Sequence, residues 1–201
     1  MADPTTDPYT FTQTWFDPNI PVWTQIAAEL PTCTNVLEIG SYEGRSAVWV
    51  IENMLQPNGT LTAIDTWEGG EEHVDMGVNM GAVEQRFDHN ISTALSTHRN
   101  RTIRKLKGTS FQHLRTLPEA TYDFIYIDGS HIARDVLCDA CLAWPLLRIG
   151  GLLTFDDYLW GNPRDAIHRP KIAIDNFVNI YAEQLAFFHI GNQLTIKKIN
   201  G

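Results

Sequence analysis

Short apolar runs and segments of helical spacing alternate along this chain. An apolar run closed by a glycine or an acid predicts a strand, and apolar residues three or four positions apart predict a helix. The predicted strands are 36–39, 61–64, 102–106, 124–127, 152–155, 186–189 and 193–197. The predicted helices are 46–55, 77–95, 110–116, 133–147 and 172–180. Such alternation is typical of an α/β fold in which helices cover both faces of a mostly parallel sheet.

The chain length and the segments between the predicted elements indicate the domain organisation. The 201 residues are enough for one domain with a full core, with an N-terminal extension at 1–19 and a substrate loop at 158–171. Gly150-Gly151 is expected to be a turn before the strand 152–155. The last two strands are separated only by a short turn at Gly191-Asn192, so we expect them to form an antiparallel edge of the sheet.

Composition narrows the possible partners. The formal net charge of −9 argues against nucleic acid, because a phosphate backbone requires a basic face. No window reaches the roughly 18 apolar residues of a membrane span, and the N-terminus does not have the pattern of a signal peptide. Three cysteines are too few for a disulfide framework. We therefore expect a cytoplasmic protein that binds neither nucleic acid nor membrane.

Two of the predicted strands end in carboxylates. Asp128 follows the strand 124–127, with His131 three residues later, and Asp156-Asp157 follows the strand 152–155. Because parallel strands end at the same edge of a sheet, these side chains are expected to converge as a hard-cation site beside a proton acceptor. Neighbouring residues in a strand point to opposite faces, so Asp156 and Asp157 can share a cation only if the strand ends before them.

A second set of polar and glycine residues follows the first two predicted strands. Gly40 and Gly44 let backbone N–H groups approach a ligand at a helix N-terminus. Asp65 ends the second strand, where an acid can accept hydrogen bonds from ribose hydroxyls. The glycines stand four apart and do not form G-x-G-x-x-G, so an NAD-dependent dehydrogenase is disfavoured. The combination favours a nucleoside-bearing ligand.

These motifs together resemble class I S-adenosylmethionine-dependent methyltransferases, and most closely small-molecule O-methyltransferases of the catechol and macrolide-sugar types. The resemblance covers about residues 35–160 and rests on LEIGSYEGRSAV at 37–48, on Asp65, and on a strand–acid element followed by G-G-x-x-x-x-D-D. It implies a Rossmann-like, doubly wound, seven-stranded sheet. It also implies a metal-assisted methylation of a small-molecule hydroxyl, on a sugar or a phenolic natural product, with S-adenosylmethionine and Mg²⁺ as cofactors.

The resemblance also assigns cofactor contacts. Gly40 and its neighbours would line the methionine portion, with Ser46 at its carboxylate, and Asp65 would hold the ribose. Glu38 would either contact the cofactor through water or brace the turn. The expected cofactor residues are Glu38, Gly40, Ser41, Tyr42, Gly44, Ser46, Asp65, Thr66, Trp67, Gly108, Thr109, Ser110 and Asp128.

In the resembled enzymes, the positions of Asp128, Asp156 and Asp157 bind a divalent metal and that of His131 is a general base. Two alternatives without these roles stay open. His131 could be a helix-start residue that only forms a hydrogen bond to its turn, and Asp128 could bind a ribose or an amine without a metal. The alternative functions are a metal-independent N- or protein methyltransferase and a noncatalytic S-adenosylmethionine-binding protein. A homodimer formed through exposed apolar surface is a further expectation.

Overall fold

The computed structural model describes residues 7–70, 73, 76–161 and 165–201. Residues 1–6 of the expected N-terminal extension, 71–72, 74–75, and 162–164 of the expected substrate loop lie outside the described residues. The strands are β1 (Asn35–Ile39), β2 (Thr60–Asp65), β3 (Thr102–Lys107), β4 (Tyr122–Ile127), β5 (Leu147–Phe155), β6 (Leu185–Ile190) and β7 (Leu194–Lys198). The helices are α1 (Ile20–Glu29), α2 (Arg45–Asn53), α4 (Met80–Thr97), α5 (Ser110–Leu114), α6 (Ala133–Ala143) and α7 (Pro170–Ile180).

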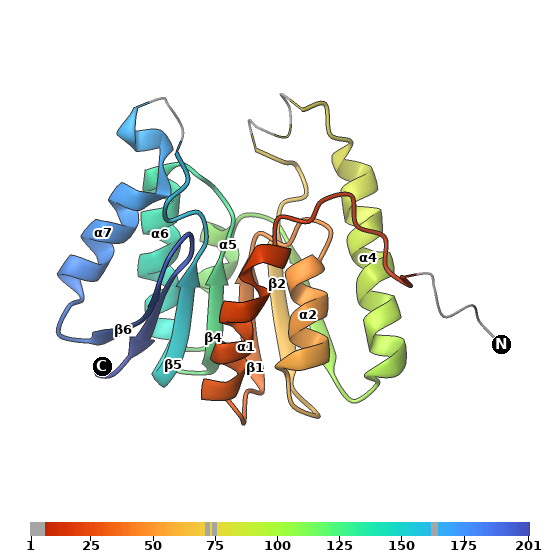
Figure 1. Cartoon of the computed structure of the whole chain (residues 1–201), viewed down its shortest axis with the longest axis horizontal. Helices are drawn as coiled ribbons and strands as arrows, with labels where there is room; N and C mark the ends of the chain where they lie inside the picture. Colours follow the sequence, from red (N-terminus) through yellow and green to blue (C-terminus); the bar gives the residue numbers. More distant parts are fainter. Residues whose placement is uncertain (1–6, 71–72, 74–75, 162–164) are drawn as a thin grey trace.

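The strands form one seven-stranded sheet in the order β3-β2-β1-β4-β5-β7-β6 (Figure 1). Strands β1 to β5 pair in parallel, whereas β7 is antiparallel to both β5 and β6. The predicted α/β fold with a mostly parallel sheet is confirmed, and the closing hairpin forms its antiparallel edge. The parallel strands therefore bring the loops that follow β1, β2, β4 and β5 to one edge of the sheet.

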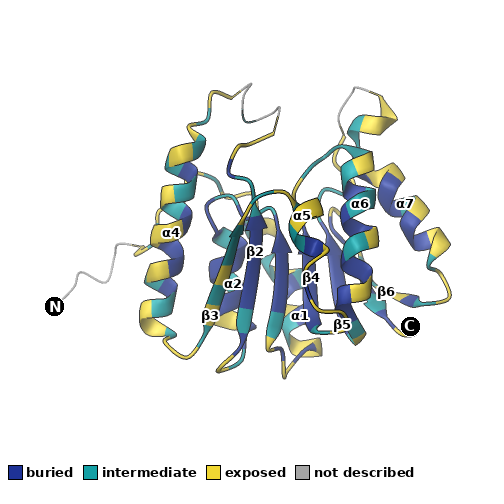
Figure 2. Cartoon of the chain, turned by 180° about the vertical axis from the view of Figure 1, so that it is seen from behind, coloured by how far each residue is buried: buried dark blue, intermediate teal, exposed yellow. Residues whose placement is uncertain are grey.

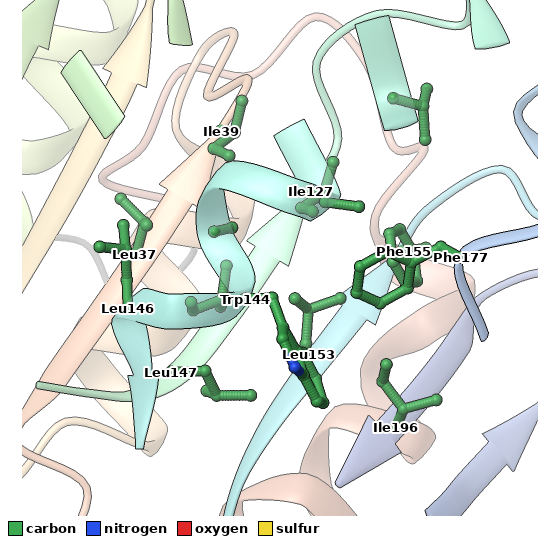
Figure 3. Close-up of a cluster of buried hydrophobic side chains, with 14 of the residues drawn as sticks. Leu37, Ile39, Ile127, Trp144, Leu146, Leu147, Leu153, Phe155, Phe177 and Ile196 are labelled. Atoms are coloured by element: carbon green, nitrogen blue, oxygen red, sulfur yellow. The ribbon is translucent and has the colours of Figure 1, made fainter. Parts of the chain in front are cut away.

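Helices cover both faces of the sheet, so its central strands are largely buried and rich in apolar residues (Figures 1 and 2). Every residue of β4 is buried. Phe124 and Tyr126 of β4 pack in the cluster formed with α1, α2 and α4, whereas Ile125 and Ile127 pack on the opposite face with α6 and α7. Figure 3 shows part of this second cluster, where Phe177 of α7 lies 5.7 Å from Phe155 of β5 between ring centroids.

Two predicted boundaries differ from the structure around β5. The helix predicted over 133–147 ends at Ala143, because Pro145 cannot continue a helix. Gly150-Gly151 is not a turn before the strand but lies inside β5. Gly150 adopts φ +84°, and the register between β4 and β5 shifts before the pairing of Phe124. The strand thus passes through an irregularity instead of starting after it.

Helix α1 was not predicted and packs deep in the core, with Trp23 and Ile26 fully buried. At the other side of the sheet, β3 is an edge strand whose Lys105 pairs with Glu84 and Asp88 of α4. Across the described part of the chain, no helix is long and apolar enough to span a membrane.

Candidate active site

A cavity of about 1670 Å³ opens at the carboxyl edge of the sheet. A pocket for one small ligand typically has about 300–1,000 Å³, so this cavity has room for a cofactor and a second molecule. Among the expected cofactor residues, those that line it are Gly40, Ser41, Tyr42, Ser46, Asp65, Thr66, Gly108, Thr109, Ser110 and Asp128. The expected catalytic and metal residues His131, Asp156 and Asp157 line the same cavity.

Gly40 is the point at which the loop after β1 contacts the loop after β4. Its φ of +82° is a left-handed conformation, and a Cβ atom at this position would lie 2.0 Å from the carbonyl oxygen of Asp128. The Asp128 N–H in turn donates to the carbonyl of Ile39 at 2.8 Å. Only glycine allows the loop after β1 to touch the loop after β4 in this way.

Glu38 braces the turn that follows β1. Its buried carboxylate accepts hydrogen bonds from the hydroxyls of Ser41 at 2.7 Å and Ser46 at 2.5 Å. Burial raises the pKa of Glu38 to about 7, although the two hydroxyl donors partly offset this effect. Of the two expected roles of Glu38, the geometry favours the bracing one. The hydroxyl of Ser46, expected at the cofactor's carboxylate, is directed to Glu38.

Asp65 holds the same turn from the neighbouring strand. Its carboxylate accepts the backbone N–H groups of Ser41 at 2.8 Å, Tyr42 at 2.9 Å and Trp67 at 2.7 Å. Three donors of this kind fix both the carboxylate and the loop. Asp65 also lines the cavity.

Three of the expected cofactor residues support the site without lining the cavity. Glu38 lies beneath the turn, and a Cβ on Gly44 would meet the ring of Phe87 at 2.9 Å. Trp67 is buried, packs 4.9 Å from Phe87 between ring centroids and donates its Nε1–H to the carbonyl of Tyr42. The expected place of Trp67 beside the adenosine is therefore corrected: its ring belongs to the core under α4.

The structure brings the three predicted metal residues together. Carboxylate oxygens of Asp128, Asp156 and Asp157 lie within 4.8 Å of one another. Strand β5 ends at Phe155, and Asp157 adopts φ +54°, so the alternation of side chains across a strand does not apply to this pair. This answers the geometric question raised by their adjacency in sequence.

The electrostatics of this cluster fit a cation. Burial and the charges of Asp156 and Asp157 raise the pKa of Asp128 well above its usual value. Burial and the charge of Asp157 likewise raise the pKa of Asp156. A bound divalent cation would relieve this repulsion, and an all-oxygen donor set suits Mg²⁺. The residues present therefore fit the metal that the motifs imply.

His131 lies at the edge of the acidic cluster. Its Nε2 is 2.6 Å from Oδ2 of Asp157, and its ring stacks on Trp160 with 4.6 Å between centroids. A carboxylate beside an imidazole orients the ring and stabilises its protonated form. His131 therefore contacts a carboxylate that follows another strand, and not only its own turn.

The N-terminal segment, residues 9–19, lies against the cavity although the sequence predicts no role for it. Thr10 exchanges two hydrogen bonds with the side chain of Asn90, at 2.8 and 3.0 Å, and the Thr12 N–H donates to the buried carboxylate of Glu43 at 2.6 Å. These contacts lay the segment along the cavity, where Trp15 and Phe16 form part of the wall. This described part of the expected extension therefore lines the cavity.

The order and direction of the strands, with a cavity above the carboxyl edge of the sheet, define a Rossmann-like α/β fold. The chain belongs to the family described as a methyltransferase domain, whose pattern matches residues 37–158, more than half of the chain. The expectation of a methyltransferase is thereby confirmed. No curated protein matches the chain in sequence.

Solved structures with the same fold include several methyltransferases. The O-methyltransferase TomG from Streptomyces achromogenes, in complex with SAM, has 19% identity and a TM-score of 0.65, over 90% of this chain and 80% of its own. An O-methyltransferase from Bacillus cereus, in complex with SAH, has 18% identity and a TM-score of 0.60, over 90% and 81%. The SAH-bound methyltransferase PaMTH1 from Podospora anserina has 17% identity and a TM-score of 0.60, over 89% and 77%. At these identities the likeness establishes the fold.

Proposed function

We propose that this methyltransferase transfers a methyl group from S-adenosylmethionine (SAM) to a hydroxyl of a small molecule, a sugar or a phenolic natural product, with help from a divalent cation, Mg²⁺. The observation that carries the proposal is the convergence of Asp128, Asp156 and Asp157 beside His131, in the cavity that also holds the turn after β1. The SAM and SAH complexes of TomG and the Bacillus cereus enzyme support the choice of methyl donor.

The loops after β1 to β3 supply the donor half of the proposed site. The turn around Gly40, held by Glu38 and Asp65, would receive the methionine portion of SAM. Asp65 would face the ribose, and Thr109 and Ser110 after β3 would lie near the adenine. In this arrangement the turn is already ordered by protein hydrogen bonds, so little ordering remains for the cofactor to impose.

The loops after β4 and β5 supply the acceptor half. A divalent cation, when bound, would lower the pKa of an acceptor hydroxyl. The carboxylates of Asp128, Asp156 and Asp157 would hold that cation. His131 would take the hydroxyl proton, and Asp157 would stabilise the imidazolium that results. SAM, when bound, would supply the methyl group: the acceptor oxygen would bond to the methyl carbon as the carbon–sulfur bond breaks, leaving SAH.

The test is a methyl-transfer assay with SAM against a panel of phenolic and sugar hydroxyl compounds. We expect activity to disappear with EDTA and to return on addition of Mg²⁺. His131→Ala should lower turnover by about 10²–10⁴-fold, the usual effect of losing a general base, and should leave SAH affinity unchanged. His89→Ala, on the exposed face of α4, is the matched control and should keep full activity.

Each outcome separates the alternatives. Turnover that is insensitive to EDTA would favour a metal-independent N- or protein methyltransferase. SAH binding without turnover on any acceptor would favour a noncatalytic SAM-binding protein. Unchanged turnover in His131→Ala would refute the base assignment alone. The cytoplasmic location and the homodimer stay predictions.

A further inference from the structure

A buried row of polar side chains leads from the acidic cluster into the core. Tyr126 on β4 places its hydroxyl 2.7 Å from Oδ2 of Asp156 and 3.0 Å from Oδ2 of Asp128. Gln193, just before β7, places its Nε2 3.1 Å from Oδ1 of Asp156 and 3.3 Å from the Tyr126 hydroxyl. On the other side, the Nε1–H of Trp23 in α1 donates to Oε1 of Gln193 at 2.8 Å.

The chemistry of these groups sets the direction of every hydrogen bond. The indole of Trp23 can only donate, so the Gln193 atom that faces it must be the carbonyl oxygen. The amide NH₂ of Gln193 then points to Asp156 and to the Tyr126 oxygen. Because the Tyr126 oxygen accepts from Gln193, its own proton is directed to a carboxylate. All of the donors in the row therefore point toward the acidic cluster.

This arrangement constrains Asp156 in particular. One of its oxygens accepts from Gln193 and the other from Tyr126, so rotation of the carboxylate would break one bond or the other. The same Tyr126 hydroxyl lies within reach of Asp128 and so sets the spacing between two of the carboxylates. Trp23, Tyr126 and Gln193 are all at most 2% exposed, so water does not compete for these bonds.

The row joins three segments that lie far apart in the chain. Trp23 packs edge-to-face on Tyr126 with 4.7 Å between ring centroids, which holds the phenol in place from the α1 side. Gln193 comes from the closing hairpin, 37 residues after Asp156. Neither α1 nor the hairpin carries a predicted metal ligand, yet both reach the acidic cluster through this row.

We infer that Tyr126 and Gln193 are positioning residues that hold Asp156 and Asp128 in the geometry required by a divalent cation, with Trp23 fixing the orientation of the Gln193 amide. This inference rests on the metal site of the proposed function. Hydrogen-bond partners of metal ligands typically contribute about 10–100-fold to metal affinity. Their loss is therefore expected to weaken cation binding and to leave the donor half of the site intact.

The experiment measures two affinities in the full chain: that of Mn²⁺, from the spin-resonance signal of the free ion, and that of SAH, from calorimetry. Tyr126→Phe and Gln193→Leu are each expected to raise the Kd for Mn²⁺ by about tenfold or more. The Kd for SAH should stay within about twofold. The double variant should lose less than the product of the two single losses, because both residues act on Asp156.

Thr195→Val is the matched control. Thr195 shares a buried hydroxyl–hydroxyl bond of 2.9 Å with Thr154 between β5 and β7, two residues from Gln193 but apart from the carboxylates. It should lower thermal stability and keep both affinities. If Tyr126→Phe fails to fold, Gln193→Leu carries the test.

Two results would overturn the inference while the wild type binds Mn²⁺. One is a Kd for Mn²⁺ that stays within about twofold in the variants, although they lose hydrogen bonds to the carboxylates. The other is an equal loss of Mn²⁺ and SAH affinity, which would indicate general damage to the fold. Absence of Mn²⁺ binding by the wild type would instead refute the metal site of the proposed function, and the inference with it.

Discussion

Replacing Glu38 with Gln is expected to make the protein's stability less sensitive to pH. In the folded chain this carboxyl is buried under the turn after β1, and its pKa is raised from 4.5 to about 7. The neutral form is therefore favoured in the folded state. Well below pH 4.5 the carboxyl is protonated in both the folded and the unfolded chain, so it does not lower the free energy of unfolding. As the pH rises toward 7, the unfolded chain releases the proton first, so the free energy of unfolding falls.

The magnitude follows from the two pKa values. One pKa unit corresponds to about 1.4 kcal/mol, so the difference between 4.5 and about 7 amounts to about 3 kcal/mol of lost stability above neutral pH. Gln has nearly the same shape and does not ionise. The hydroxyls of Ser41 and Ser46 can rotate so that one donates to the amide oxygen and the other accepts from the amide nitrogen. The variant should therefore keep its hydrogen bonds and lose the penalty.

The assay is urea denaturation of the wild type and Glu38→Gln at several pH values from 5 to 8. The free energy of unfolding of the variant should rise relative to the wild type by about 2–3 kcal/mol across this range. Glu183→Gln, at an exposed acid, is the control and should show a constant difference. A constant difference for Glu38→Gln as well would refute the reasoning, because it would mean that Glu38 is ionised alike in both states.

Two further substitutions test the contacts that shape the cavity. Gly40→Ala should lower the free energy of unfolding by more than about 2 kcal/mol in urea denaturation, because its Cβ would lie 2.0 Å from the Asp128 carbonyl oxygen at a left-handed φ. Gly161→Ala is the control and should have little effect, because no atom lies within 4 Å of the added Cβ. Equal losses of stability in the two variants would contradict this account. Asn90→Ala should cost about 2–4 kcal/mol, because it removes two hydrogen bonds to Thr10 of the N-terminal segment and a buried one to the Glu43 carbonyl. Asn176→Ala, on the exposed face of α7, should change stability by less than about 0.5 kcal/mol, and an equally small effect at Asn90 would count against the anchoring role.

Most of the fold could be predicted because its signals are local. Apolar runs marked each strand of the sheet, and helical spacing marked α2, α4, α6 and α7. Helix α1 carries a comparable signal in the spacing of Trp23 and Ile26, yet it is absent from the predicted helices. The prediction of a turn at Gly150-Gly151 was wrong. Two adjacent glycines are typical of a turn, but they also occur where a strand continues through an irregularity.

The candidate site could be predicted only in part. Gly40, Asp65, Asp128, Asp156 and Asp157 were identifiable because residues at strand ends reach one edge of a parallel sheet wherever they lie in the chain. Trp67 was misplaced, since an aromatic residue after a strand end can turn either toward a ligand or into the core. No pattern in the sequence marks Gln193, a single amide in a hairpin, as a partner of Asp156.

The amino-acid sequence alone determined the class of fold and the chemistry available at its carboxyl edge, because hydrophobic periodicity and strand-end residues are read from positions close together in the chain. Only the tertiary structure decided which of those residues meet. The left-handed Asp157 turns two adjacent carboxylates to one side, and burial raises the pKa of Glu38. The N-terminal segment, α1 and the closing hairpin reach the site through contacts between residues far apart in sequence, and such contacts depend on packing that no local pattern encodes.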